Sequence, residues 1–306
     1  DIVLQKQAYT LQAAEIDGGK EDPAYKIMRK AIAKSSYHRQ QVDQYTCEVY
    51  LKGGGRLVDA PWFLEKTLKK EGLDTSATFV TESVSEITYN RPGDYKERVI
   101  SIRSTGDDQN TSPMNYINSS LYEPEISNLI SPFSPKAFGY YKFKYLSTFT
   151  DRGYQVNEIQ VIPRSRGEDV FAGKIYVVED LWAIHSVNLY FVIQGVKINV
   201  NQVFAPVETN VWMPVSHKYD GTGKILGFEF EFQYLATVRK YDIKLNEELA
   251  QTFTVLDEKT EQEAIESRES KPETNLDKRV NQSEEKLMSG GELTRKELKK
   301  LTRAYE

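Results

Sequence analysis

Gly173-Lys-Ile-Tyr-Val-Val-Glu-Asp-Leu-Trp-Ala-Ile-His-Ser-Val-Asn-Leu-Tyr190 is the stretch that decides the fold. Apolar and polar residues alternate on both sides of Glu179-Asp180, which is the pattern of two half-buried strands joined by a tight turn. More alternating segments follow it directly along the chain. We therefore expect a hairpin inside a run of antiparallel strands, with one face of the sheet packed and the other in water.

The same alternation extends outward from this hairpin in both directions. Asp220-Gly-Thr-Gly223 has the composition of a hairpin turn, and Gly53-Gly-Gly55 that of a turn or bulge. In the last predicted strand we expect Leu226, Phe228, Phe230 and Phe232 on the inward face. Many consecutive hairpins make a strongly curved sheet. Strands are predicted at 42–52, 76–90, 94–104, 140–145, 159–161, 171–178, 182–192, 196–204, 211–219 and 225–238.

A helix is predicted before the first strand. Asp22-Pro23 forms an N-cap followed by proline at the first helical position, and Ile27, Met28, Ala31 and Ile32 repeat at helical spacing. The helix, at about 22–39, is expected to cover the sheet, together with short helices in 105–136. The predicted fold class is α+β, a strongly curved antiparallel sheet (a half-barrel) with helices on its concave face.

Composition predicts three parts of the chain. Residues 1–16 are expected to be the end of a preceding domain or an extended leader, and 17–246 the curved-sheet domain. Residues 247–306, rich in Glu, Lys, Ser and Asn, are expected to be a charged linker with a short helix, started by the capping box Thr294-Arg-Lys-Glu297. A second charged and helical segment is predicted near Phe63. We expect the sequence to be a piece of a longer protein.

Charge argues against two classes of partner. The 306 residues carry a net charge of -5, with a pI near 5.5. An acidic chain is a poor ligand for nucleic acid and for the surface of an anionic membrane.

Cysteine and histidine are few in this chain, and the carboxylates are numerous but scattered. Cys47 alternates with apolar neighbours and is expected to be a buried structural thiol. The three histidines, His38, His185 and His217, have no zinc-ligand spacing, and the two on strands are expected to be paired or exposed. No nucleotide-binding loop or nucleophile elbow is found. We therefore predict no enzyme activity, no cofactor and no metal, although a hydrolase with carboxylates distant in sequence stays open.

Aromatic residues are the candidates for a binding cavity. Between the sheet and its cover, aromatic bulk fills space more often than it lines an empty one, so we expect a mostly filled interior and a module that works through its surface and loops. The residues expected to line or fill this space are Tyr116, Tyr122, Phe133, Phe138, Trp182 and Phe228.

Two stretches resemble a known family. They run from Ala24-Tyr-Lys-Ile-Met to Tyr45-Thr-Cys-Glu-Val-Tyr-Leu-Lys-Gly53, and from Pro132-Phe-Ser-Pro-Lys to Glu179-Asp-Leu-Trp-Ala-Ile184. They resemble the middle, periplasmic region of the DUF5686 family. That family consists of Bacteroidota outer-membrane proteins with a carboxypeptidase-regulatory-like sandwich before this region and a C-terminal β-barrel after it. The resemblance covers about 20–245. The predicted helix and curved sheet are also similar to LolA- and LolB-type lipoprotein carriers.

The resemblance implies a function outside catalysis. It implies a non-enzymatic binding or scaffold module on the periplasmic side of the outer membrane, with the protein's own barrel as partner and another periplasmic protein or a lipid as a further candidate partner. The alternative is a carrier or sensor that holds a lipid or other apolar ligand in the half-barrel. A continuous apolar cavity would favour the alternative.

Overall fold

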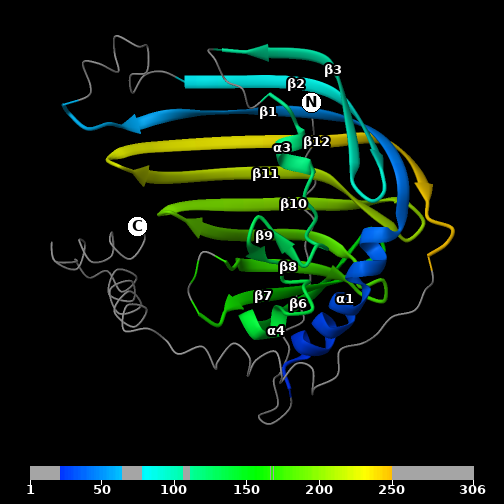
Figure 1. Cartoon of the computed structure of the whole chain (residues 1–306). Helices are drawn as coiled ribbons and strands as arrows, with labels where there is room; N and C mark the ends of the chain where they lie inside the picture. The colour runs from blue at the N-terminus through cyan, green and yellow to red at the C-terminus, as the bar shows by residue number, and fades with distance from the viewer. Residues whose placement is uncertain (1–20, 64–77, 106–110, 166, 168, 250–306) are drawn as a thin grey trace, which may run out of the picture.

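The computed structural model describes residues 21–63, 78–105, 111–165, 167 and 169–249. These residues form one large antiparallel sheet and few helices (Figure 1). The long strands are β1 (Val42–Asp59), β2 (Thr78–Asn90), β3 (Asp94–Ser104), β6 (Tyr141–Asp151), β7 (Tyr154–Pro163), β8 (Ala172–Val178), β9 (Ile184–Ile193), β10 (Val196–Glu208), β11 (Val211–Ile225) and β12 (Phe228–Leu245).

The strand order is β3-β2-β1-β12-β11-β10-β9-β8-β7-β6. From β6 to β12 each strand pairs with the next along the chain, and the predicted turn at Glu179-Asp180 joins β8 to β9. The prediction of an antiparallel sheet is confirmed. One strand pairing joins distant parts of the chain, because β12, the last strand described, pairs with β1, the first. Their paired residues run from Val42 opposite Leu245 to Asp59 opposite Glu229.

Two glycine-rich segments predicted as turns are strand interior. β11 continues through Asp220-Gly-Thr-Gly223, and the turn comes later, at Leu226 and Gly227, both with positive φ. β1 runs straight through Gly53. A Cβ there would lie 2.1 Å from Cδ1 of Tyr234. Gly53 and, on β11, Gly221 are therefore needed because aromatic rings of β12 lie across them, and not because the chain reverses.

The helix α1 (Pro23–Gln40) forms where it was predicted, with Asp22 as its N-cap. The Asp22 carboxylate accepts from the backbone N–H of Ala24 at 2.9 Å and from that of Tyr145, on edge strand β6, at 3.0 Å. The cap therefore also attaches the helix to the edge of the sheet. The apolar stripe of α1 packs in a cluster with β6 to β9 and with Phe133 and Phe138.

The segment between β3 and β6 has less helix than predicted. It contains one-turn helices α3 (Met114–Ile117) and α4 (Ala137–Tyr140), and a two-stranded ribbon of β4 (Glu125–Ile126) and β5 (Leu129–Ile130). Serine side chains hold its turns: Ser131 Oγ donates to the carbonyl of Leu121 and accepts from the N–H of Phe133. The protein is accordingly mostly β, with less helix than the α+β prediction implied.

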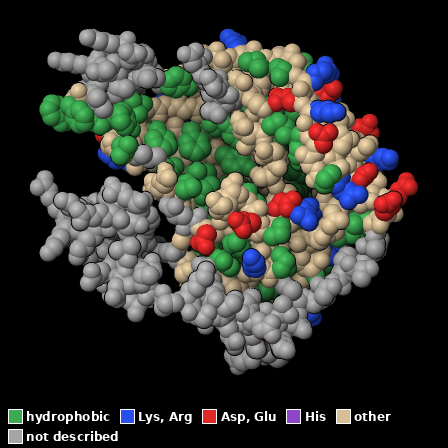
Figure 2. All heavy atoms as spheres, viewed as in Figure 1, with side chains coloured by type: hydrophobic (Ala, Val, Ile, Leu, Met, Phe, Trp, Pro, Cys, Tyr) green, Lys and Arg blue, Asp and Glu red, His purple; other side chains and the backbone are tan. Residues whose placement is uncertain are grey.

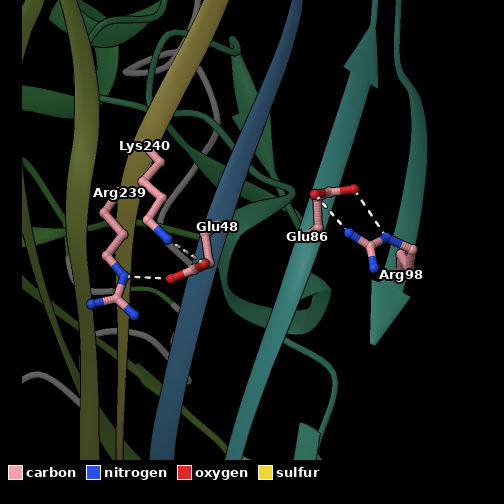
Figure 3. Close-up of polar contacts among 5 residues, drawn as sticks. All are labelled: Glu48, Glu86, Arg98, Arg239 and Lys240. Atoms are coloured by element: carbon pink, nitrogen blue, oxygen red, sulfur yellow. Dashed lines mark hydrogen bonds and ion pairs between the residues drawn. The ribbon is translucent and has the colours of Figure 1, made fainter. Parts of the chain in front are cut away.

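The sheet face away from α1 carries paired charges. Glu48 on β1 accepts from Arg239 at 2.6 Å and from Lys240 at 2.9 Å, and Glu86 on β2 binds Arg98 on β3 (Figure 3). Arg239 and Lys240 are neighbours in sequence, yet both contact Glu48. The register shift between Thr46 and Glu48 explains this, since a β-bulge lets consecutive residues face the same side.

The other face holds two apolar clusters. The larger lies under α1 and under the segment before β6. The smaller lies over β1, β2 and β12 and contains Cys47, Val49, Leu51, Ile87, Ile117, Ala236 and Val238. In the last predicted strand, four residues were expected to face inward. Leu226 does not, because it lies in a turn and is 89% exposed, and Phe228, Phe230 and Phe232 are half-buried.

Several predictions lie outside the described residues. These are the leader at 1–16, the helical segment after Phe63 and the terminal helix after residue 249. In the parts of the chain that are described, no helix has both the length and the apolar character to cross a membrane.

Candidate binding pocket

A pocket of about 430 Å³ opens on the helix-bearing face, where the two apolar clusters adjoin. Figure 2 shows hydrophobic side chains gathered in a hollow on this side of the molecule, with charged side chains around part of its rim. The pocket is enclosed by the C-terminal end of α1, the start of β1, the turn between β2 and β3, the segment 114–123, β10 and β11.

Strand β11 supplies the two side chains at the base of the pocket. Trp212 and His217 are five residues apart, so strict alternation would place them on opposite faces of the sheet. The register between β10 and β11 shifts at Pro214, which pairs with Phe204, while Ser216 pairs with Val203. This bulge brings Trp212 and His217 to the same face, where they are 5% and 1% exposed.

Aromatic rings form the wall. Tyr45 stacks on Tyr89 at 4.9 Å between ring centroids, and Tyr89 contacts Tyr95 at 4.8 Å. On the opposite side, Tyr122 stacks on His38 at 5.2 Å and meets Phe204 edge-on. Burial of the phenols raises the pKa of Tyr45 and Tyr122 above the usual value. The aromatic wall is therefore uncharged, and slightly more than half of the pocket lining is apolar.

Several polar groups of the wall and rim already have partners. Tyr122 Oη accepts from the N–H of Ile184 at 2.8 Å, and a ring nitrogen of His38 lies 3.0 Å from the carbonyl of Leu181. Burial lowers the pKa of His38 to about 4, so its ring is neutral. Arg39 and Glu123 form an ion pair at 2.5 Å, with both side chains partly in solvent. This pair joins α1 to the covering segment at the rim.

Trp212 and His217 differ from these groups. Among the described residues, neither Nε1 of Trp212 nor either ring nitrogen of His217 has a hydrogen-bond partner. Burial lowers the pKa of His217 to about 4. The prediction that this histidine is paired or exposed is wrong, and its neutral ring contains one buried N–H donor and one buried nitrogen acceptor that no described residue uses.

The six aromatic residues predicted to line or fill a cavity are distributed over several places. Tyr122 lines the pocket. Phe133, Phe138 and Trp182 are buried in the larger cluster, which they fill. Tyr116 packs against the smaller cluster, and Phe228 is half-buried at the start of β12. Most of the interior is therefore filled, and the open part is lined chiefly by residues that the sequence did not single out.

Other candidate groups are apart from the pocket. Cys47 is 2% exposed and is a buried thiol as predicted; burial raises its pKa to about 12. His185 binds Asp151 at 3.0 Å. In the described part of the chain, no three His, Cys, Asp or Glu side chains come together as a metal site would need.

Comparison with known proteins gives a family. The family model described as "Family of unknown function (DUF5686)" matches residues 27–241. No curated protein matches the sequence.

Among solved structures, the chain is similar to a DUF1329 family protein from Desulfovibrio piger, with 9% identity, a TM-score of 0.30 and coverage of 75% of this chain and 96% of that one. It is also similar to a putative outer membrane lipoprotein-sorting protein domain from Vibrio parahaemolyticus, with 9% identity, a TM-score of 0.29 and coverage of 73% and 94%. A LolA superfamily protein from Nitrosomonas europaea has 9% identity, a TM-score of 0.24 and coverage of 72% and 93%. Similarity at this level assigns no function to the chain.

Proposed function

The chain belongs to the DUF5686 family of unknown function, and we propose that it is a non-enzymatic binding module that holds a ligand with an apolar body in the pocket beside His217. We place the module on the periplasmic side of an outer-membrane β-barrel protein, with that barrel as its partner. In this proposal the helix-bearing face is the concave face of a half-barrel, and the ligand enters from that side.

The open pocket is the observation that carries the proposal. Protein interiors are close-packed, and an open hollow of several hundred Å³ leaves apolar side chains in contact with water. Pockets of about 300–1,000 Å³ with mostly apolar walls and a few polar groups are typical of small-molecule sites. The volume of about 430 Å³ and the ring of tyrosines meet that description. A scaffold that used only its surface would have no need of this space.

The test is binding of diphenylhexatriene, a hydrocarbon that fluoresces only in apolar surroundings. We expect saturable fluorescence with the wild-type protein. Val42 is buried and lines the pocket, so Val42→Phe should place a ring in that space and abolish the signal. Val42→Ile adds one methylene group and is the matched control, with binding retained. Absence of a saturable signal from wild type, or the same signal from Val42→Phe, would refute the proposal.

A further inference from the structure

The pocket base carries unused hydrogen-bonding capacity. Trp212 and His217 are among the most buried polar side chains of the described chain, at 5% and 1% exposure, and both line the pocket. Their three ring nitrogens have no partner among the described residues, and protein atoms cover them in the ligand-free structure, so a ligand reaches them when the side chains around them move. Buried polar groups in native proteins are almost always paired, and each unpaired one calls for an explanation such as an absent ligand.

Neighbouring polar groups are not available to supply that pairing. Gln202 lies beside them on β10, and its amide donates to Tyr219 Oη at 3.2 Å. Tyr219 in turn donates to the carbonyl of Tyr116 at 3.1 Å. The unused nitrogens are therefore left over beside these two hydrogen bonds, and they are buried, whereas the Arg39–Glu123 pair lies at the rim of the pocket with both side chains partly in solvent.

The charges around the pocket disfavour an ionised ligand. Arg39 is the one cationic side chain among the described lining residues, and Glu123 already neutralises it. His217 is held neutral by burial. A carboxylate or phosphate placed at the base would lose its hydration without gaining a counter-charge, which is unfavourable. A neutral group that both donates and accepts matches the indole N–H and the neutral imidazole.

We propose that the ligand of this pocket is a neutral amphiphile whose hydroxyl or amide group hydrogen-bonds to Trp212 Nε1, to His217 or to both, while its apolar body lies against the tyrosine wall. This inference rests on the proposed function and deepens it. Ligands of this class share an uncharged head and a chain or ring system of moderate size, and an ionised fatty acid is outside it.

Displacement of diphenylhexatriene tests the inference, with 1-decanol and decanoate as competitors at pH 7.5. The two differ at the head, and decanol should compete at least tenfold more strongly. Trp212→Phe keeps an aromatic ring and removes the N–H, so it should weaken decanol about tenfold, the equivalent of one hydrogen bond. His217→Leu should act in the same direction. His185→Leu, next to Trp212 but outside the pocket, is the matched control and should leave competition unchanged.

The outcomes separate the two proposals. If wild type fails to bind diphenylhexatriene, the proposed function itself is wrong. If it binds the hydrocarbon but decanoate competes as well as decanol, the neutral-head inference is wrong and the binding function stands. Unchanged competition by decanol in both Trp212→Phe and His217→Leu, each shown to be folded by circular dichroism, would equally overturn the inference.

Discussion

Replacing His217 with leucine should make the ligand-free protein more stable. The side chain is 1% exposed and its two ring nitrogens have no partner among the described residues. An unpaired buried polar group costs about 1–3 kcal/mol, and leucine fills similar volume without that cost. We therefore expect the free energy of unfolding at pH 7 to rise by about 1–3 kcal/mol. A residue kept at this cost is consistent with a role in binding.

The stability advantage of His217→Leu over wild type should increase in acid, because of the lowered pKa of His217. Burial lowers the pKa of His217 from the ordinary 6.5 to about 4. Above pH 6.5 the ring is neutral in both states and contributes no pH dependence. Between pH 6.5 and 4 the unfolded chain binds a proton that the native protein excludes, so stability falls by about 1.4 kcal/mol per pH unit. By pH 4.5 titration of His217 has lowered the free energy of unfolding of the wild type by about 3 kcal/mol. His217→Leu has no such contribution to lose.

Urea denaturation of both proteins at pH 7 and pH 4.5 measures this difference. Carboxylates and His38, whose pKa is also lowered to about 4 by burial, contribute to wild type and variant alike and cancel in the comparison. His185→Leu is the control: it loses the contact with Asp151 and should be less stable at neutral pH. The reasoning is refuted if His217→Leu is less stable than wild type at pH 7, or if its advantage does not grow in acid.

Three further predictions concern the fold. Phe133→Ala, at a position with no exposure, should lower the free energy of unfolding by about 3–5 kcal/mol. Phe230→Ala, at a half-buried position, should lower it by clearly less. Equal losses in urea titrations would show that Phe230 is as fully buried as Phe133. Asp22→Ala removes a helix cap and the acceptor for Tyr145 N–H, and should cost about 1–2 kcal/mol, whereas an unchanged melting temperature would show that the cap contributes nothing. Cys47, buried and with its pKa raised to about 12, should react with a thiol reagent at pH 8 only after denaturation, and fast labelling of the native protein would contradict its burial.

Local patterns were sufficient to predict most of the elements. Period-two alternation located the strands around Glu179-Asp180, and a capping residue with an apolar stripe located α1, because both signals depend on neighbours in sequence. Two turns predicted from glycine, at 220–223 and 53–55, were wrong. In β11 and β1 glycine serves the close approach of a ring from another strand, which is a contact between segments far apart in the chain.

The pocket was not predictable in the same way. Its base depends on a bulge that breaks alternation between Trp212 and His217, and the one local sign of it was a proline inside a strand, Pro214. The missing partners of His217 are a property of the packed molecule and leave no trace in the sequence. Tyr122 was singled out for its bulk, whereas its position depends on a hydrogen bond to Ile184, on strand β9.

The pairing of β1 with β12 has a consequence for the time at which the sheet can be completed. β2 is available soon after β1 emerges, but the other edge of β1 waits for a strand that ends at Leu245. That edge therefore stays unpaired until nearly the whole described chain is present, and pairing between segments so far apart in sequence is slow to form. Until then the chain presents unpaired backbone beside Val49 and Leu51, so a holding chaperone has its greatest value before β12 arrives.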